Sequence, residues 1–262
     1  MRFGIDVCTL GEFAEPALVV DIALAAEAAG WEALFVWDHL AFAWGVPSAD
    51  PWVTLAAVAQ ATSELRIGTA VTPLPRRRPQ VVASALTTLD RLSRGRAVLG
   101  VGIGGVDVEY TAFGESADLK SRARLLDAGL DTVAGLLGGH SVNGVTLSPL
   151  PIQQPRPPIL VGGAGKAALR RAARWDGWLA AGDDEDGSMT TSPSEIAAAV
   201  ELIREQRDLA AGPFEVALVG ASRGPDDPLL AEYADAGVTL WLEHIHLRRD
   251  SLEGLMRRIG DR

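Results

Sequence analysis

The sequence has little of what would tie the protein to an oxidising compartment, a membrane or a nucleic acid. Cys8 is its one cysteine, so no disulfide can form within the chain. The 34 acidic residues outnumber the 24 basic ones, and a formal charge of -10 argues against general binding to nucleic acids or acidic membranes. The N-terminus has no signal-peptide pattern, and no uncharged apolar run is long enough to span a bilayer. We therefore expect a cytoplasmic protein that binds neither membranes nor nucleic acids.

What the sequence does contain is a regular alternation of strand and helix patterns. We predict strands at residues 2–8, 33–37, 65–71, 96–101, 159–161, 177–181, 215–219 and 238–242. Helices are predicted to follow them at 16–29, from Asp50-Pro51 onward, and at 79–92, 121–137, 166–174, 193–209, 228–236 and 250–259. Such alternation produces a parallel sheet, either doubly wound or closed into a barrel. Eight units in 262 residues match a (β/α)8 TIM barrel, predicted here as a single domain spanning residues 1–262.

One segment, residues 138–158, interrupts this alternation after the fourth helix. It is rich in glycine, proline and polar residues, and Asn143-Gly144 within it is typical of a hairpin turn. We therefore expect an excursion from the barrel at this point.

Small residues dominate the positions just after the predicted strands, where a (β/α)8 barrel carries its active site. These positions include GIGG at residues 102–105, GGAG at 162–165 and AAGDD at 180–184. Small residues at strand ends leave space for a large flat ligand and let backbone amides contact it. The sequence therefore predicts a ligand-binding cavity with few acids and bases.

Asp38 and His39 differ from these positions, because they end a buried apolar strand and precede the aromatic residues Phe42 and Trp44. One interpretation is a hydrogen-bonding pair at the cavity floor, with the imidazole as proton donor or electrostatic partner. The other is a helix-capping aspartate and a histidine with a purely structural role. Their place at a strand end beside aromatic residues favours the functional interpretation.

Three further stretches have the composition of anion-binding segments. GGAGK at residues 162–166 follows a strand and opens a helix, so it either holds a phosphate or makes a tight turn. GVGIGG at 100–105 matches G-x-G-x-x-G, but residues 106–118 are predicted as a loop, and a Rossmann site requires a helix there. The basic run at residues 76–78 is either a solvated loop or a clamp for an anionic group.

Two histidines near the C-terminus suggest a metal site that the rest of the sequence does not complete. His244 and His246 flank Ile245, so both are expected to point the same way from an extended segment. A metal ion would need further His, Cys or acidic ligands at suitable spacing, and none is evident, so we predict no metal site. Cys8 has no activating neighbour in the sequence and is expected to be a core or cavity-lining residue.

Five sequence blocks occur along nearly the whole chain in an order and spacing that match a known family. They are AAEAAGWEALFVWDHL, DPWVTLAAVAQATSELRIGTAVTPLPRRRP, LDRLSRGRAVLGVGIGG, PPILVGGAGKAALRRAARWDGW and AGVTLWLE. On these blocks the chain resembles the luciferase-like monooxygenase superfamily, barrel flavoproteins that include bacterial luciferase and the coenzyme F420-dependent reductases and dehydrogenases.

The resemblance implies a luciferase-like barrel that binds coenzyme F420 or FMN and acts on a small-molecule substrate. It implies that His39 is the active-site histidine, with Asp38 beside it in the cofactor pocket. Ala70-Val71 falls where members carry a non-prolyl cis peptide bond behind the flavin ring. The remaining cofactor contacts that it implies are Ile103, Gly104, Gly162, Gly163, Ala164, Ala180 and Ala181, with the phosphate at the two glycines of residues 162–163. Relatives are commonly dimers, so by analogy a homodimer is expected.

One position departs from the family pattern. In the sugar-phosphate dehydrogenases of this family, a catalytic glutamate follows a glycine at the end of the fourth strand. This chain has Gly105 at the position of that glutamate. The nearest acids here are Asp107 and Glu109. The departure argues against oxidation of a sugar phosphate by that mechanism.

Our leading hypothesis is an oxidoreductase that transfers a hydride between bound coenzyme F420, or FMN, and a small organic substrate. The Asp38-His39 pair and the basic run favour F420. The alternatives are an FMN-dependent monooxygenase and a non-catalytic flavin-binding barrel, the latter suggested by the small number of acids and bases. The missing Rossmann helix argues against a nicotinamide dehydrogenase.

Overall fold

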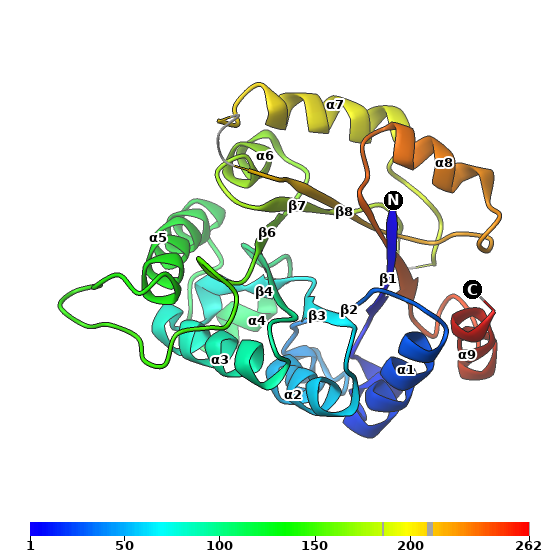
Figure 1. The fold of residues 1–262 in the computed structure, drawn as a ribbon, viewed down its shortest axis with the longest axis horizontal. Helices are drawn as coiled ribbons and strands as arrows, with labels where there is room; N and C mark the ends of the chain where they lie inside the picture. The colour runs from blue at the N-terminus through cyan, green and yellow to red at the C-terminus, as the bar shows by residue number, and fades with distance from the viewer. Residues whose placement is uncertain (185, 209–211, 262) are drawn as a thin grey trace.

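Parallel strands close into a barrel in the computed structural model of the chain, which describes residues 1–184, 186–208 and 212–261 (Figure 1). The strands are β1 (Arg2–Val7), β2 (Ala33–Val36), β3 (Arg66–Thr69), β4 (Thr72–Pro73), β5 (Ala97–Gly102), β6 (Ile159–Gly162), β7 (Gly177–Ala181), β8 (Glu215–Gly220) and β9 (Leu240–Ile245). They are ordered β3-β2-β1-β9-β8-β7-β6-β5-β4, and a further pairing of β3 with β5 closes the ring. β3 and β4 both pair with β5, so together they occupy one position in the barrel. The nine strands therefore fill the eight positions of the expected (β/α)8 barrel, and the predicted fold class is confirmed.

Helices surround the barrel on its outside (Figure 1). They are α1 (Pro16–Ala28), α2 (Pro51–Ala61), α3 (Pro79–Leu92), α4 (Val108–Thr111), α5 (Leu119–Leu137), α6 (Lys166–Ala172), α7 (Pro193–Arg204), α8 (Pro228–Asp235) and α9 (Leu252–Gly260). Their starts follow from capping chemistry: Asp50 accepts hydrogen bonds from two backbone amides of α2, and Ser192 and Glu195 form a capping box on α7. The prediction that this helix continues to residue 209 is wrong, because α7 ends at Arg204; residue 209 itself lies outside the described residues.

The structure corrects one local prediction and extends another. Residues 106–118, expected to be a loop, contain the short helix α4. The excursion 138–158 leaves the barrel beside α5 as a long loop (Figure 1), with Val142 and Val145 forming one antiparallel bridge around the predicted turn. Buried Asp90 anchors the returning chain by accepting hydrogen bonds from the backbone amides of Ile152 and Gln153.

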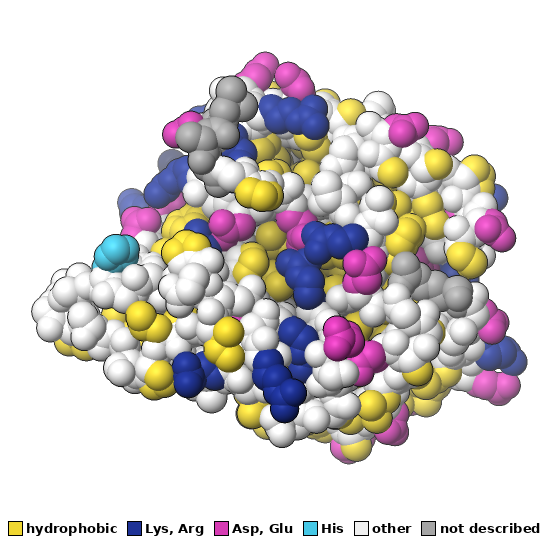
Figure 2. All heavy atoms as spheres, viewed as in Figure 1, with side chains coloured by type: hydrophobic (Ala, Val, Ile, Leu, Met, Phe, Trp, Pro, Cys, Tyr) yellow, Lys and Arg dark blue, Asp and Glu magenta, His cyan; other side chains and the backbone are white. Residues whose placement is uncertain are grey.

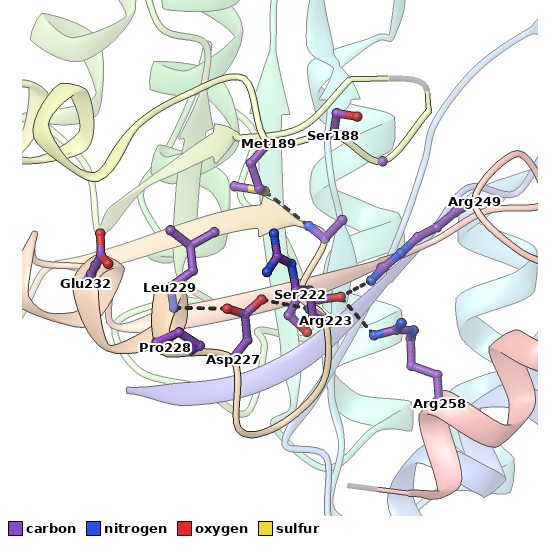
Figure 3. Close-up of a pocket in the computed structure, with 12 residues that line it drawn as sticks. Ser188, Met189, Ser222, Arg223, Asp227, Pro228, Leu229, Glu232, Arg249 and Arg258 are labelled. Atoms are coloured by element: carbon purple, nitrogen blue, oxygen red, sulfur yellow. Dashed lines mark hydrogen bonds between the residues drawn. The ribbon is translucent and has the colours of Figure 1, made fainter.

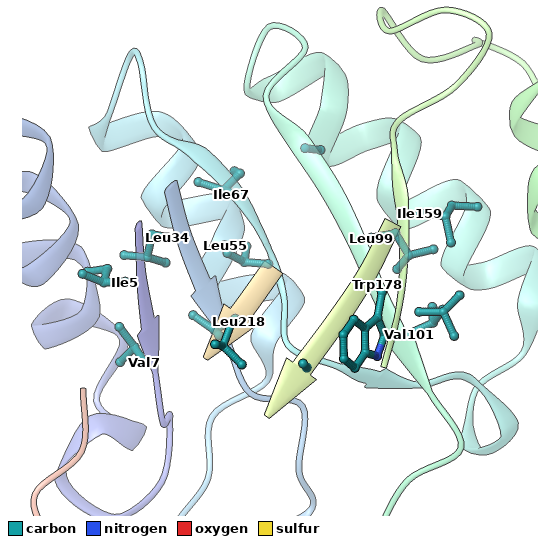
Figure 4. Packing of buried hydrophobic residues seen from close by; sticks show 14 of the residues in the cluster. Ile5, Val7, Leu34, Leu55, Ile67, Leu99, Val101, Ile159, Trp178 and Leu218 are labelled. Atoms are coloured by element: carbon teal, nitrogen blue, oxygen red, sulfur yellow. The ribbon is translucent and has the colours of Figure 1, made fainter. Parts of the chain in front are cut away.

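Apolar side chains fill two layers because successive residues of a strand face opposite sides of the sheet. Figure 4 shows part of the outer layer, which packs between the strands and the helices and includes Leu34, Leu99 and Leu218. A smaller cluster that includes Phe35 and Leu242 fills the barrel interior. The cluster closes the middle of the barrel and separates its two ends. A cavity of about 360 Å³ lies at the N-terminal ends of the strands, lined by Arg2, Arg66 and Glu215 among others, but active sites of (β/α)8 barrels lie at the C-terminal end.

Lys and Arg side chains are interspersed with Asp and Glu side chains on the face seen in Figure 2, unlike the continuous basic surface of a nucleic-acid-binding protein. Over the part of the chain that the structure describes, no helix combines the length and the apolar character needed to cross a membrane.

Gly100 is required where β3 and β5 close the barrel. A Cβ atom on this residue would lie 1.9 Å from the carbonyl oxygen of Thr69, a backbone atom that cannot move freely. We expect Gly100→Ala to lower the free energy of unfolding by about 1–3 kcal/mol, measured by urea denaturation. Gly105→Ala is the control, because nothing lies within 4 Å of its added Cβ, and equal stability of the two variants would contradict the prediction.

Candidate active site

A cavity of about 370 Å³, called here the mouth cavity, lies at the C-terminal ends of the strands. Asp38 and His39 line it, together with seven residues for which a cofactor contact was expected: Ala70, Val71, Gly104, Gly162, Gly163, Ala164 and Ala181. The barrel thus brings together residues from five separate strand ends. A volume of this size lies within the range of small-molecule and cofactor sites.

A larger cavity of about 710 Å³ lies between the segment after β7 and the helices α8 and α9 (Figure 3). Figure 3 shows Arg249 and Arg258 directed at the carbonyl oxygen of Ser222, to which both donate hydrogen bonds. The same two side chains also pair with buried Glu243. Since these charges are engaged and no histidine is among the described residues that line this cavity, we place the candidate active site in the mouth cavity.

The floor of the mouth cavity is shaped for a flat ligand. Ala70 and Val71 are joined by the expected non-prolyl cis peptide bond and line the floor. Glycine is needed next to them, because a Cβ on Gly162 would meet the Val71 side chain at 2.9 Å and one on Gly104 would meet the Tyr110 hydroxyl at 2.3 Å. The small residues present leave the space that a flavin-type ring needs, and packing against Val71 and Tyr110 requires glycine at these two positions.

Two of the residues expected to contact the cofactor do not line the mouth cavity. Ala180 belongs to the outer core, because it alternates with the cavity-facing Ala181 along β7. Ile103 packs against the same outer core, and the residue that faces the cavity is its neighbour Gly104. In both cases the resemblance to the family indicated the correct strand end. The residue that lines the cavity is the next one along the chain.

His39 pairs with Glu109, a fully buried residue of α4. The His39 Nδ1 and Glu109 Oε1 atoms are 2.9 Å apart, and the backbone amide of Leu40 donates to the same oxygen at 2.7 Å. Burial opposes ionisation of Glu109, but the hydrogen bond and charge of His39, helped by Arg76, hold the pKa of this carboxyl below its ordinary value. Glu109 is therefore an acceptor for the Nδ1–H of His39, which leaves Nε2 as the nitrogen available to a ligand.

Asp38 is held by the basic run and does not pair with His39. Arg76 donates to Asp38 Oδ1 at 2.8 Å, and Arg77 donates to both of its carboxylate oxygens at 2.7 and 2.8 Å. The Asp38 side chain is 0% exposed and that of Arg76 is 5% exposed. The proposed hydrogen-bonding pair of Asp38 and His39 is thus wrong, and two of the three arginines proposed as an anion clamp serve to fix Asp38.

A second group of ionisable side chains, called here the polar cluster, consists of Asp6, Asp183, His244 and His246. His244 Nδ1 lies 2.9 Å from Asp183 Oδ2, and the rings of His244 and His246 are 4.3 Å apart. Burial raises the pKa of Asp6 to about 7, and it lowers the pKa of His246 to about 4. We expected no further residue able to bind a metal ion near the two histidines. That expectation is wrong, since Asp183 lies beside them at the end of β7.

Trp37 separates this cluster from His39. Its ring lies 5.5 Å from the His39 ring and 5.3 Å from the His244 ring, and its indole N–H donates to Asp6 Oδ2 at 2.7 Å. Cys8 takes no part in this chemistry, because burial raises the pKa of its thiol to about 12. The mouth cavity therefore has two distinct polar sides on a small-residue floor.

A parallel barrel with such a cavity at its C-terminal mouth defines a class of enzyme that binds a small-molecule ligand. Within that class, the chain belongs to the luciferase-like monooxygenase family, whose sequence model matches residues 3–224.

Individual relatives agree with this assignment. The chain is 30% identical over 227 residues to an uncharacterised protein of Mycobacterium tuberculosis, a match that covers 76% of this chain and 75% of the relative. It is 33% identical over 189 residues to an F420-dependent glucose-6-phosphate dehydrogenase of Microbacterium testaceum, covering 66% of this chain and 54% of that protein. Its fold is similar to that of an F420-dependent secondary alcohol dehydrogenase, with a TM-score of 0.79 and 17% identity over 99% of this chain and 97% of the other. The family and its members support an oxidoreductase or monooxygenase activity of the flavin or F420 type.

Proposed function

We propose that the protein is an oxidoreductase that binds coenzyme F420, or FMN, in the mouth cavity and transfers a hydride between this cofactor and a small organic substrate. The observation that carries the proposal is the combination, in one cavity, of a floor of small residues with the His39–Glu109 pair. The relative named as an F420-dependent dehydrogenase supports F420 as the first choice. A small-molecule substrate, a homodimer and a cytoplasmic location remain predictions.

The residues that would hold the cofactor divide between its ring and its phosphate. Ala70, Val71, Gly104 and Ala181 would contact the ring, because they form the small-residue floor and wall of the cavity. Gly162, Gly163 and Ala164 would contact the phosphate, since they line the cavity at the turn between β6 and α6, where Gly163 and Ala164 are exposed. A compact turn of small residues lets a phosphate approach the backbone closely.

The bound cofactor would supply the hydride chemistry, and the protein would supply position and proton transfer. His39 lines the cavity, and Glu109 fixes the orientation of its ring through Nδ1. Nε2 of His39 would accept the proton that leaves the substrate during oxidation, or donate it during reduction. The ionised Glu109 would stabilise the protonated imidazole by its charge.

An FMN-dependent monooxygenase is the second candidate, and the family to which the chain belongs favours it. The two candidates share the cavity and differ in the fate of the reduced cofactor. A monooxygenase would consume oxygen together with its substrate, whereas a dehydrogenase or reductase would turn over without oxygen. Comparing turnover with and without oxygen distinguishes them.

Cofactor titration tests the central proposal. We expect FMN or coenzyme F420 to bind saturably at one site per chain, followed by fluorescence or absorbance. Gly162→Val should abolish this binding, because its side chain would enter the space beside Val71. Gly260→Ala is the control, since its added Cβ meets nothing within 4 Å. Failure of both cofactors to bind, together with tight binding of a nicotinamide dinucleotide, would overturn the proposal.

A further inference from the structure

The polar cluster brings together three metal-ligand side chains from two strand ends. Asp183 follows β7, and His244 and His246 project from the end of β9 on the side of the sheet that faces the barrel interior. One ligand atom from each of the three residues lies within 4.8 Å of those of the other two. The side chains of His244 and Asp183 are 6% and 2% exposed, and His246 is 6% exposed. These residues therefore form a buried group.

Several polar atoms of this group have no partner. Nε2 of His244 and Nε2 of His246 have no hydrogen-bond partner among the described residues, and neither has Oδ1 of Asp6 beside them. A buried polar atom without a partner is destabilising, so such an atom often marks a place where water, a ligand or an ion binds. The unpartnered Nε2 of His246 is an imidazole nitrogen, a usual ligand of transition metals.

We propose that Asp183, His244 and His246 form a binding site for a divalent transition-metal ion. Two ligand atoms of a tetrahedral ion on bonds of about 2.0–2.1 Å are about 3.3 Å apart. The His244 Nδ1 and Asp183 Oδ2 atoms are hydrogen-bonded at 2.9 Å, so they would move apart by a few tenths of an ångström to share an ion. The third ligand, His246, needs only a side-chain adjustment, because its ring is already 4.3 Å from that of His244.

The charges around the site favour a cation. Asp6 and Asp183 place two carboxyl groups next to His244. Two basic side chains, Arg248 and Arg249, also act on His246. Arg249 pairs with Glu243, which alternates with His244 along β9 and so lies on the other side of the strand. Two imidazoles and one carboxylate select Zn²⁺, Fe²⁺ or Co²⁺ over Mg²⁺ and Ca²⁺, which prefer oxygen ligands alone.

The site would open toward the mouth cavity. His244 and Asp183 both line that cavity, on the opposite side of Trp37 from His39. Three protein ligands leave coordination positions free, as in metal sites that bind a further ligand. The inference concerns metal binding by the chain itself and does not depend on the proposed cofactor.

Zinc titration of the metal-free full-length protein tests the inference. We expect isothermal titration calorimetry with ZnCl2 to show one site per chain, and MgCl2 to show none. His244→Gln and Asp183→Asn should each weaken Zn²⁺ binding by about 10- to 100-fold. Replacing Zn²⁺ by Co²⁺ should give ligand-field absorption bands that the same variants lose.

The two remaining histidines provide the control. A double variant, His39→Gln with His140→Gln, removes the other imidazoles of the chain and should leave Zn²⁺ binding unchanged. His246→Gln provides a second test of the cluster should His244→Gln unfold, as judged by circular dichroism. Zinc binding that is absent from the native chain, or that persists in both His244→Gln and His246→Gln, would overturn the inference. Cofactor titration of the same metal-free protein reports separately on the proposed function.

Discussion

His39→Ala should slow cofactor reoxidation in the presence of an acceptor substrate by about 10²–10⁴-fold, the usual contribution of a positioned acid or base. The reason is that Nε2 of His39 is the nitrogen left available in the mouth cavity once Nδ1 is bound to Glu109. Cofactor affinity should change little, because the floor of small residues makes most of the proposed contact. The measurement is a single-turnover reoxidation of the reduced cofactor, with a parallel cofactor titration.

Glu109→Gln separates the charge of the carboxylate from its hydrogen bond. The amide oxygen still accepts from the Nδ1–H of His39, so the ring keeps its orientation, but the protonated imidazole loses the stabilising charge. We expect a smaller loss of rate than in His39→Ala and a shift in the pH dependence of turnover. His140→Ala is the matched control on an exposed histidine. Normal turnover by a His39→Ala variant that binds cofactor would rule out the proton-transfer role of His39.

Asp38→Asn should lower the free energy of unfolding by about 1–3 kcal/mol, the cost of leaving buried polar groups short of a partner. The change removes the carboxylate that the buried guanidinium of Arg76 and the partly exposed one of Arg77 both contact. Arg76 keeps a second carboxylate partner, Glu109, at 3.3 Å, so its charge is not left unpaired. Urea denaturation followed by circular dichroism measures the effect.

An exposed pair gives the comparison for this prediction. Asp131 and Arg174 are 3.5 Å apart with side chains 66% and 56% exposed, so Asp131→Asn should change stability by less than about 1 kcal/mol. Equal losses in the two variants would show that burial does not govern the Asp38 pair. A stable Asp38→Asn protein with lost turnover would instead assign Asp38 a direct part in the chemistry.

The strand ends illustrate how much of the site the sequence could predict. Position after a buried strand predicted that His39 lies at the cavity, and the structure places it there. The small residues at the ends of β3, β5, β6 and β7 predicted a cavity where one is found. The misses came from side-chain direction and from partners. Ala180 and Ala181 are adjacent in the sequence, and a strand boundary uncertain by one residue reverses which of them faces the cavity.

Partners were beyond the reach of the sequence because the barrel brings distant residues together. His39 and Glu109 are 70 positions apart, and Asp183 and His244 are 61 apart, yet each pair is in hydrogen-bond contact at 2.9 Å. Glu109 lies in the short helix α4. This helix has four residues, too few to show the apolar periodicity by which a helix is recognised in a sequence.

The sequence by itself determined the order of strands and helices, the barrel and the strand ends that carry the site, because local patterns of apolar and small residues fix these features. Only the tertiary structure decided that Glu109 pairs with His39 and that the arginines pair with Asp38. It also decided that Asp183 lies beside the two histidines. The physical reason is that closure of the barrel sets which strand ends face one another, and no local pattern encodes that choice.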